Sequence, residues 1–122
     1  MPKKIIFSEK APAPIGPYSQ AVIVNDTLYV SGQIAFEESQ GGDVKTEARQ
    51  VMENIGHILT AAGLNYGHIV KSSIFLKNMD DFALVNEVYG SYFGSEPPAR
   101  ETVQVAKLPK DVNVEISVIV VK

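Results

Sequence analysis

The chain has 122 residues, of which 45% are hydrophobic and 20% are charged, and its formal net charge at pH 7 is −3. These values are typical of one folded domain spanning residues 1–122, and they exclude an intrinsically disordered chain. The acidic balance and the scattered Lys and Arg residues argue against nucleic-acid binding, which requires clustered basic side chains.

The residue inventory excludes several further classes of site. Cysteine is absent, so we expect no disulfide bond, no thiolate nucleophile and no cysteine-type zinc site. The two histidines, His57 and His68, are too few for a histidine-rich metal site. No apolar run approaches the roughly 18 residues of a membrane span, and no apolar signal segment opens the chain. We therefore expect a cytoplasmic protein without a membrane or metal partner.

Hydrophobic periodicity, prolines and glycines define the predicted elements. The regular spacing of apolar residues predicts two helices, and Gly63 and Gly94 are placed to end them. Asn25 and Asp26 form a two-residue connection of hairpin type. In chain order we predict a strand over residues 4–7, a rigid proline-rich loop over 11–17, a hairpin over 21–24 and 27–34, a polar loop over 35–43, a helix over 44–62, a strand over 69–76, a helix over 80–93, and strands over 101–106 and 112–121.

This order contains two strand–helix–strand crossovers. If both are right-handed, the two helices lie on one face of one sheet, which predicts a two-layer α+β sandwich. The other face carries hydroxyls mixed with aromatic and aliphatic side chains. Because that mixture is too apolar for full exposure, we expect an oligomer that buries it.

Arg100 follows Pro97, Pro98 and Ala99 directly and precedes a strand-like run. The two prolines stiffen the corner, and a guanidinium held there is suited to binding a carboxylate through two hydrogen bonds. An ordinary surface charge at a strand edge, or a partner for Glu101, is the alternative.

Glu115 interrupts the apolar last strand. By period-two alternation it shares a face with Asn113, Ser117, Ile119 and Val121. Its carboxyl group is therefore either partly desolvated, with a perturbed pKa, or simply exposed on the strand.

Four further residues have both a functional and a structural interpretation. Tyr18, at the exit of the proline-rich loop, is either a hydroxyl aimed into a cleft or a packed loop residue. Asn86 lies on or beside the packed helical stripe, as a site residue or as a structural hydrogen-bonding group. Ser31 and Gly32 interrupt a strand, where glycine permits close approach of a ligand or marks a bulge.

Five segments resemble the Rid family of reactive-intermediate (enamine/imine) deaminases, also called YjgF-like proteins. The resemblance covers essentially the whole chain, and the five motifs are specific in combination. They are Ile15-Gly16-Pro17-Tyr18-Ser19-Gln20-Ala21, Val30-Ser31-Gly32-Gln33-Ile34, Val85-Asn86-Glu87-Val88-Tyr89, Pro98-Ala99-Arg100 with Val103-Gln104-Val105-Ala106-Lys107-Leu108-Pro109-Lys110, and Val114-Glu115-Ile116.

The resemblance implies a chorismate-mutase-like α+β fold, with two helices on one face of a mixed β-sheet. It also implies a homotrimer with a central barrel of strands and clefts between subunits. The implied activity is hydrolysis of enamine and imine acids such as 2-aminoacrylate or 2-aminocrotonate to 2-keto acids and ammonia, without a cofactor, as in a 2-iminobutanoate/2-iminopropanoate deaminase. A non-catalytic small-carboxylate-binding module of the same fold is the alternative function, and a ribonuclease or translation inhibitor ranks below both.

The same resemblance assigns roles to individual residues. Arg100 matches the arginine that grips the substrate carboxylate, Glu115 matches the acid that orients the attacking water, and Tyr18 matches the cleft tyrosine. At position 102 the backbone carbonyl contacts the substrate nitrogen. The implied substrate-binding residues are Arg100, Asn86, Ser31, Gly32, Thr102 and Phe82.

Glu101 departs from the family pattern, in which a small residue follows the arginine. Alternation predicts that Glu101 faces away from Arg100, where it pairs with Lys107. If it turned toward Arg100 instead, it would compete with an anionic substrate and lower the activity.

Overall fold

The computed structural model describes residues 2–122. Its elements are β1 (Lys4–Ile6), β2 (Ala21–Val24), β3 (Thr27–Gln33), α1 (Phe36–Ser39), α2 (Val44–Ala61), the 3₁₀ turn η1 (Tyr66–His68), β4 (Ile69–Leu76), η2 (Met79–Asp81), α3 (Phe82–Gly90), β5 (Ala99–Gln104), η3 (Pro109–Asp111) and β6 (Val114–Val121). No helix in residues 2–122 is long and apolar enough to cross a membrane.

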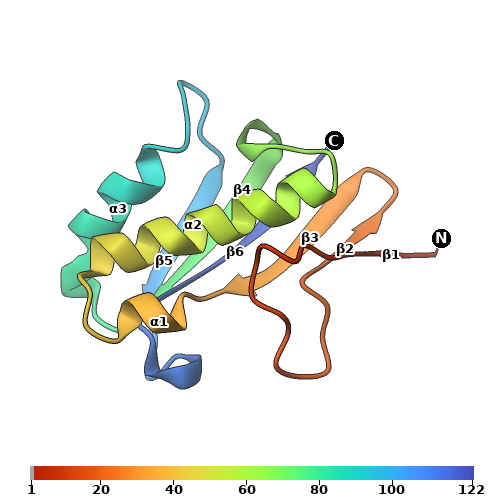
Figure 1. Cartoon of the computed structure of the whole chain (residues 1–122). Helices are drawn as coiled ribbons and strands as arrows, with labels where there is room; N and C mark the ends of the chain where they lie inside the picture. The colour runs from red at the N-terminus through yellow and green to blue at the C-terminus, as the bar shows by residue number, and fades with distance from the viewer. Residues whose placement is uncertain (1) are drawn as a thin grey trace.

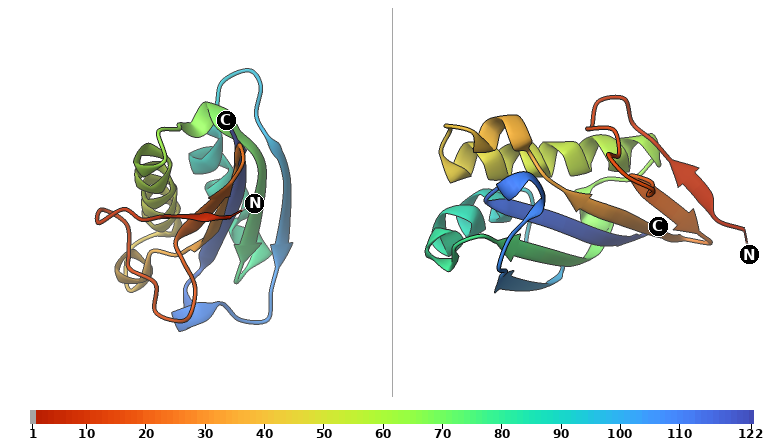
Figure 2. Two further views of the ribbon diagram at one scale, coloured as in Figure 1. Left: turned by 90° about the vertical axis from the view of Figure 1, so that its right-hand side faces the viewer. Right: turned by 90° about the horizontal axis from the view of Figure 1, so that it is seen from below.

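The six strands form one mixed sheet in the order β1-β2-β3-β6-β4-β5. Strands β4 and β5 run parallel, joined by a crossover through α3, whereas the other neighbouring pairs are antiparallel. Helices α2 and α3 lie side by side on the same side of the sheet, and no helix of residues 2–122 lies over its other side (Figures 1 and 2). The predicted two-layer α+β architecture is confirmed.

Helix α2 supplies much of the core on the covered face of the sheet. Asp43 caps its start, with Oδ1 accepting a hydrogen bond from the Thr46 N–H at 2.8 Å, and Gly63 follows its end with φ at +74°. The buried side chains of the helix include Val51, Met52, Ile55, Ile58 and Leu59, and those of β6 are Val114, Ile116, Val118 and Val120. Each such side chain stabilises the fold by about 1.5–3 kcal/mol.

The uncovered face presents a mixture of apolar and polar side chains to solvent. Tyr29 of β3 is 49% exposed, and Ile119 and Val121 of β6 are 36% and 39% exposed. The alternation predicted for β6 is therefore confirmed. The expectation that other copies of the chain cover this face stays a prediction.

Four features differ from the sequence prediction. Residues 36–39 form the short helix α1, where a loop was predicted, and α3 spans 82–90 because Asn78 caps the separate turn η2 before it. The last strand begins at Val114, since Lys110 and Asp111 adopt positive φ in η3. Strand β5 begins at Ala99, so Arg100 lies within the strand, in hydrogen-bonding register with β4.

Candidate active site

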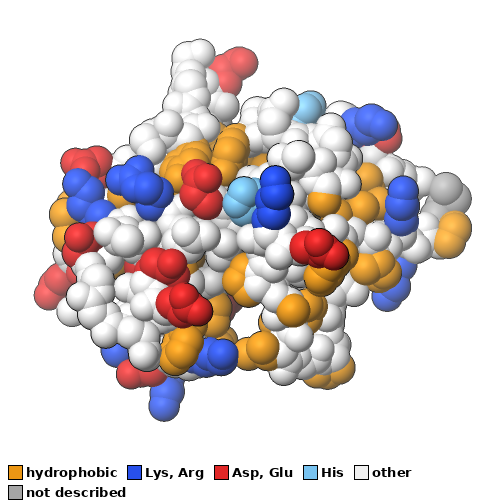
Figure 3. Space-filling view, in the orientation of Figure 1, with side chains coloured by type: hydrophobic (Ala, Val, Ile, Leu, Met, Phe, Trp, Pro, Cys, Tyr) orange, Lys and Arg blue, Asp and Glu red, His pale blue; other side chains and the backbone are white. Residues whose placement is uncertain are grey.

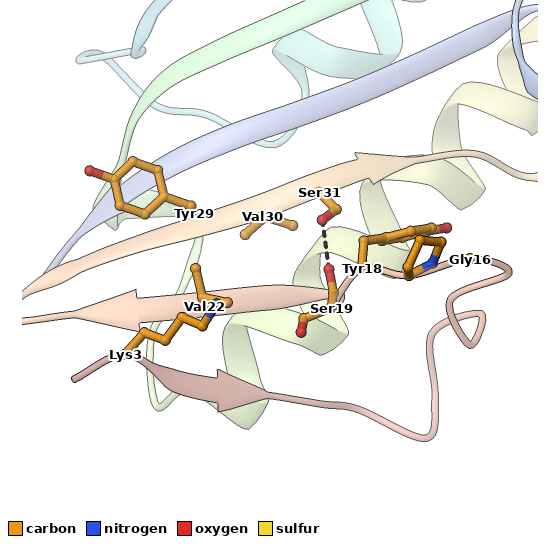
Figure 4. Close-up of a pocket in the computed structure, with 9 residues that line it drawn as sticks. Lys3, Gly16, Tyr18, Ser19, Val22, Tyr29, Val30 and Ser31 are labelled. Carbon is orange, nitrogen blue, oxygen red and sulfur yellow. Dashed lines mark hydrogen bonds between the residues drawn. The ribbon is translucent and has the colours of Figure 1, made fainter.

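The segment between β1 and β2 holds Tyr18 beside strand β3. The Ser31 hydroxyl of β3 donates a hydrogen bond to the Ser19 carbonyl at 2.6 Å (Figure 4). The Ser31 N–H donates to the Gln20 carbonyl at 2.9 Å. The Tyr18 side chain is 49% exposed. Ser31 thus fixes the end of the proline-rich loop from which the Tyr18 ring projects.

Gln20 fixes this loop as well, and sequence reasoning gave it no role. Its side chain is almost fully buried, at 2% exposed. Its Oε1 accepts from the Ser8 N–H at 2.7 Å, while its Nε2 donates to the carbonyls of Ser8 at 3.1 Å and Pro12 at 2.9 Å. One amide therefore joins both ends of the loop, a function that only the three-dimensional contacts reveal.

Glu115 lies on the uncovered face of β6, opposite Phe75 of β4, and its side chain rests against the backbone of Gly32. A Cβ atom at position 32 would lie 2.7 Å from Glu115 Cδ, so the absence of a side chain there makes room for the carboxyl group. Partial burial raises the pKa of Glu115 above its ordinary value near 4.5.

Tyr18, Ser31, Gly32 and Glu115 together line a hollow of about 380 Å³, which Ile15, Ile34 and Pro109 complete with apolar surface. Four of the residues predicted for the site thus meet in one place. A carboxyl group with a raised pKa beside an apolar wall is suited to exchanging a proton with a small molecule or water.

Arg100 lies in edge strand β5, in register with Ser72 of β4. Its guanidinium carbon is 5.2 Å from the ring centre of Tyr89 and 5.6 Å from that of Phe82, both on α3, and its NH1 donates to Asn86 Oδ1 at 2.6 Å. Cation–π contacts of this kind hold a guanidinium in place while leaving other N–H groups free for an anion. The sequence attributes the stiffness of this corner to Pro97 and Pro98, whereas in the structure Phe82, Tyr89 and Asn86 support the guanidinium.

Asn86 is exposed rather than buried, because it lies on the side of α3 that borders β5. Asn86, Tyr89, Pro97, Pro98 and Arg100 line a second hollow of about 430 Å³ together with Gly90. Tyr89 is a residue of this group to which sequence reasoning gave no role at the site. It follows Phe82 by seven residues, a helical spacing that places both rings on one face of α3.

Tyr89 has a support of its own. Its hydroxyl donates to Ser72 Oγ at 2.8 Å, and burial raises the pKa of that hydroxyl above its ordinary value. Thr102, two residues after Arg100 on the same strand face, pairs in register with Ile74. Its Oγ1 is buried without a hydrogen-bond partner among the described residues. The Thr102 side chain therefore adds no hydrogen bond near Arg100, and only its backbone groups could contribute one.

The two hollows do not meet within one chain. Arg100 is in register with Ser72, whose side chain is buried under the helices, whereas Glu115 is in register with Phe75. Ser72 and Phe75 are an odd number of residues apart on β4, so their side chains point to opposite faces of the sheet. One chain therefore holds two half-sites, an arginine half-site on the covered face and a glutamate half-site on the uncovered face.

Glu101 faces away from Arg100, as alternation predicts. Its carboxylate accepts a hydrogen bond from the Ser73 hydroxyl and pairs with Lys71 Nζ at 2.9 Å. The predicted partner, Lys107, was wrong, because Lys71 and Ser73 lie beside Glu101 on the neighbouring strand β4. Hydrogen bonds from Ser73 and Lys71 lower the pKa of Glu101. Within the chain it does not compete for the Arg100 guanidinium.

Comparison with known proteins finds many relatives of this chain. The sequence model of the family described as Endoribonuclease L-PSP matches residues 8–122. A RutC family protein of Pyrococcus horikoshii is 49% identical over 98% of this chain and 98% of its own length. The 2-iminobutanoate/2-iminopropanoate deaminase of Mus musculus is 48% identical over 98% of this chain and 92% of its own length.

Solved structures share the fold. A conserved Rid-family protein of unknown function, YyfA from Yersinia pestis, superposes with a TM-score of 0.92 at 43% identity, covering 99% of this chain and 100% of that one. TdcF from E. coli, solved with bound serine, gives a TM-score of 0.90 at 43% identity and covers 98% of both chains.

Proposed function

We propose that this chain, which belongs to the Rid (YjgF-like) family described as Endoribonuclease L-PSP, hydrolyses 2-imino acids and their enamine tautomers to 2-keto acids and ammonia. The activity would be that of a 2-iminobutanoate/2-iminopropanoate deaminase, the name of its mammalian relatives. The observation that supports this most is the pair of half-sites, one suited to gripping a carboxylate and the other to handling a proton.

The first half-site supplies binding. Arg100 keeps free N–H groups while Phe82, Tyr89 and Asn86 hold its guanidinium, so a substrate carboxylate meets a pre-positioned donor. A hydrogen bond between charged groups contributes about 1.5–3 kcal/mol. The Thr102 backbone carbonyl, on the same strand, would accept a hydrogen bond from the substrate nitrogen.

The second half-site supplies chemistry. The Glu115 carboxylate takes a proton from water as the water oxygen attacks the imine carbon, and it passes that proton to the imine nitrogen, which gives a carbinolamine. It then takes the proton of the carbinolamine hydroxyl and delivers it to the nitrogen as the C=O bond forms and the C–N bond breaks, so that ammonia and the 2-keto acid are released and the carboxylate is regenerated. Positioned acid–base help of this kind is typically worth roughly 10²–10⁴ in rate. Tyr18, Ser31 and Gly32 form the wall against which the water and the imine carbon would lie.

The chemistry requires Arg100 and Glu115 at one substrate, yet they lie on opposite faces of one sheet. A second copy of the chain is the simplest source of the missing half. We therefore propose a homotrimer in which strands from three copies bury their uncovered faces and each cleft combines the arginine half-site of one copy with the glutamate half-site of its neighbour. The exposed apolar side chains Tyr29, Ile119 and Val121 support this arrangement.

The test is a coupled assay with purified protein. An amino-acid oxidase generates the imino acids of alanine and 2-aminobutyrate in place, and release of the 2-keto acid is followed with and without the protein. The wild type should accelerate release, whereas Arg100→Ala should lower kcat/KM at least tenfold with an unchanged circular dichroism spectrum. Arg49→Ala, which changes an exposed arginine of α2, should match the wild type. Equal activity in Arg100→Ala would remove Arg100 from the site.

A binding module without turnover is the second candidate, and the serine held by the relative TdcF favours it. Calorimetry that detects 2-ketobutyrate binding, together with a wild type that leaves the rate of keto acid release unchanged, would select this candidate. Ribonuclease activity rests on the family description alone. On the face that Figure 3 draws, basic and acidic side chains are interspersed among the described residues rather than gathered into a basic stripe.

A further inference from the structure

Glu47 is a buried carboxylate that the proposed chemistry does not use. It lies in the first turn of α2, and its side chain is fully buried, at 0% exposed. Its Oε2 accepts from the backbone N–H groups of Asn113 at 2.8 Å and Val114 at 3.2 Å, and its Oε1 accepts from Asn113 Nδ2 at 2.7 Å. One side chain thus connects the start of a helix to the start of a strand 66 residues later.

The donors that hydrogen-bond to Glu47 indicate which part of the fold this residue holds. Burying a carboxylate is costly unless its oxygens are hydrogen-bonded. Here all three donors belong to Asn113 and Val114, and the N-terminal end of the α2 dipole adds favourable potential. An apolar residue would fill the same space in the core, but it would leave the backbone N–H groups of Asn113 and Val114, at the start of β6, without these partners. The contact therefore acts on the backbone of β6.

That backbone is what places Glu115. Val114 precedes Glu115 directly, and the Asn113 carbonyl accepts from the Lys77 N–H at 3.0 Å beyond the end of β4. The start of β6 is thus held by Glu47 from the covered face and by the β4 end from the side. The Glu115 carboxyl group itself rests against Gly32 without a hydrogen bond of its own among the described residues, so its position depends on its backbone.

We propose that Glu47 is a positioning residue for Glu115, holding the first residues of β6 so that the Glu115 carboxyl group stays against Gly32 at the reacting atoms. This inference rests on the proposed function for its kinetic consequence but not for its structural one. A displacement of about 1 Å in a reacting group is enough to cost on the order of 10²-fold in rate.

Two variants at position 47 separate hydrogen bonding from space filling. Glu47→Met keeps an unbranched side chain of similar length but accepts no hydrogen bond. Glu47→Gln keeps one carbonyl oxygen for the β6 N–H groups, and its amide meets the Asn113 Oδ1 once that side chain turns by 180° about its last bond. Glu53→Met, on the exposed side of the same helix, is the matched control.

Steady-state kinetics test the functional half of the proposal. Glu47→Met should lower kcat about 10- to 100-fold while KM stays within about twofold, because the arginine half-site is untouched. Glu47→Gln should retain kcat within about threefold, and Glu53→Met should equal the wild type. In a Glu115→Gln background, Glu47→Met should cause no further loss, since both changes act on the same group. A further loss there, or equal falls in kcat and in affinity, would overturn the proposal.

Hydrogen exchange tests the structural half without any activity. Glu47→Met should speed amide exchange at residues 113–116 and leave residues 72–76 of β4 near the wild-type rate. Uniformly faster exchange over the chain would show a general loss of stability and would contradict a local role. A wild type without deaminase activity would refute the proposed function, while the exchange result would still decide whether Glu47 holds the start of β6.

Discussion

The two rings against Arg100 determine how its charge is presented. The rings of Phe82 and Tyr89 confine the planar guanidinium, and Asn86 Oδ1 accepts a hydrogen bond from its NH1. A lysine ammonium would keep the charge but lose the planar fork and much of the ring contact. We propose that Arg100 is thereby prepared to bind a planar anion before that anion arrives, which is the physical basis for assigning it to binding rather than to proton transfer.

Glu115 has the opposite character, since its environment disfavours its charged form. The raised pKa means that the folded state binds a proton more tightly than the unfolded state between pH 4.5 and the raised value. The free energy of unfolding therefore falls as the pH rises through this window, and the deficit persists at neutral pH. Because the group is only partly buried, solvent screening keeps this effect small.

Glu115→Gln tests this cost directly. The variant should unfold at a higher temperature than the wild type at pH 7, while it loses deaminase activity. Well below pH 4.5 the difference should vanish, because the wild-type carboxyl group is then neutral in both states. Thermal unfolding followed by circular dichroism at several pH values provides the measurement. A Glu115→Gln variant less stable than the wild type at pH 7 would contradict the assignment of Glu115 to a desolvated site.

At the scale of elements, strand alternation could be predicted from sequence and contacts between distant segments could not. The buried face of β6 and the orientation of Glu101 follow from period two. The hydrogen bonds of Gln20 and Glu47 join residues 8 to 67 positions apart, and no local pattern marks them. Sequence reasoning assigned Arg100 and Glu115 from the resemblance, and their separation onto two sheet faces required the register of β4.

The proline-rich loop is the element whose order depends most on one side chain. Gln20→Leu keeps a similar volume but leaves the Ser8 N–H and the Pro12 carbonyl without their partners. Each unsatisfied buried group costs about 1–3 kcal/mol, so the variant should unfold at a clearly lower temperature.

The same variant should also affect the glutamate half-site, because the loop carries Tyr18. We expect kcat/KM of the folded fraction to fall several-fold and protease cleavage within residues 9–19 to accelerate. Gln104→Leu, an exposed glutamine at the end of β5, is the control for a general effect of losing an amide. Unchanged loop proteolysis in Gln20→Leu would show that Gln20 is not what orders the loop.

For the whole molecule, we propose that one working site takes Arg100 from one copy of the chain and Glu115 from another. The sheet makes this necessary if both residues act on one substrate, because their side chains leave opposite faces. The uncovered face, with Tyr29 and Ile119 exposed, offers the surface on which copies would join. Sedimentation of the wild type at three times the mass of one chain would fit the proposed trimer.

Complementation between two inactive variants tests this claim most directly. Arg100→Ala and Glu115→Gln are mixed in equal amounts, unfolded and refolded together, and native mass spectrometry verifies that mixed assemblies form. A shared site receives an intact arginine with probability one half and an intact glutamate with probability one half, so the mixture should recover about a quarter of wild-type activity. If verified mixed assemblies remain as inactive as either variant alone, the two residues do not act together across a subunit boundary.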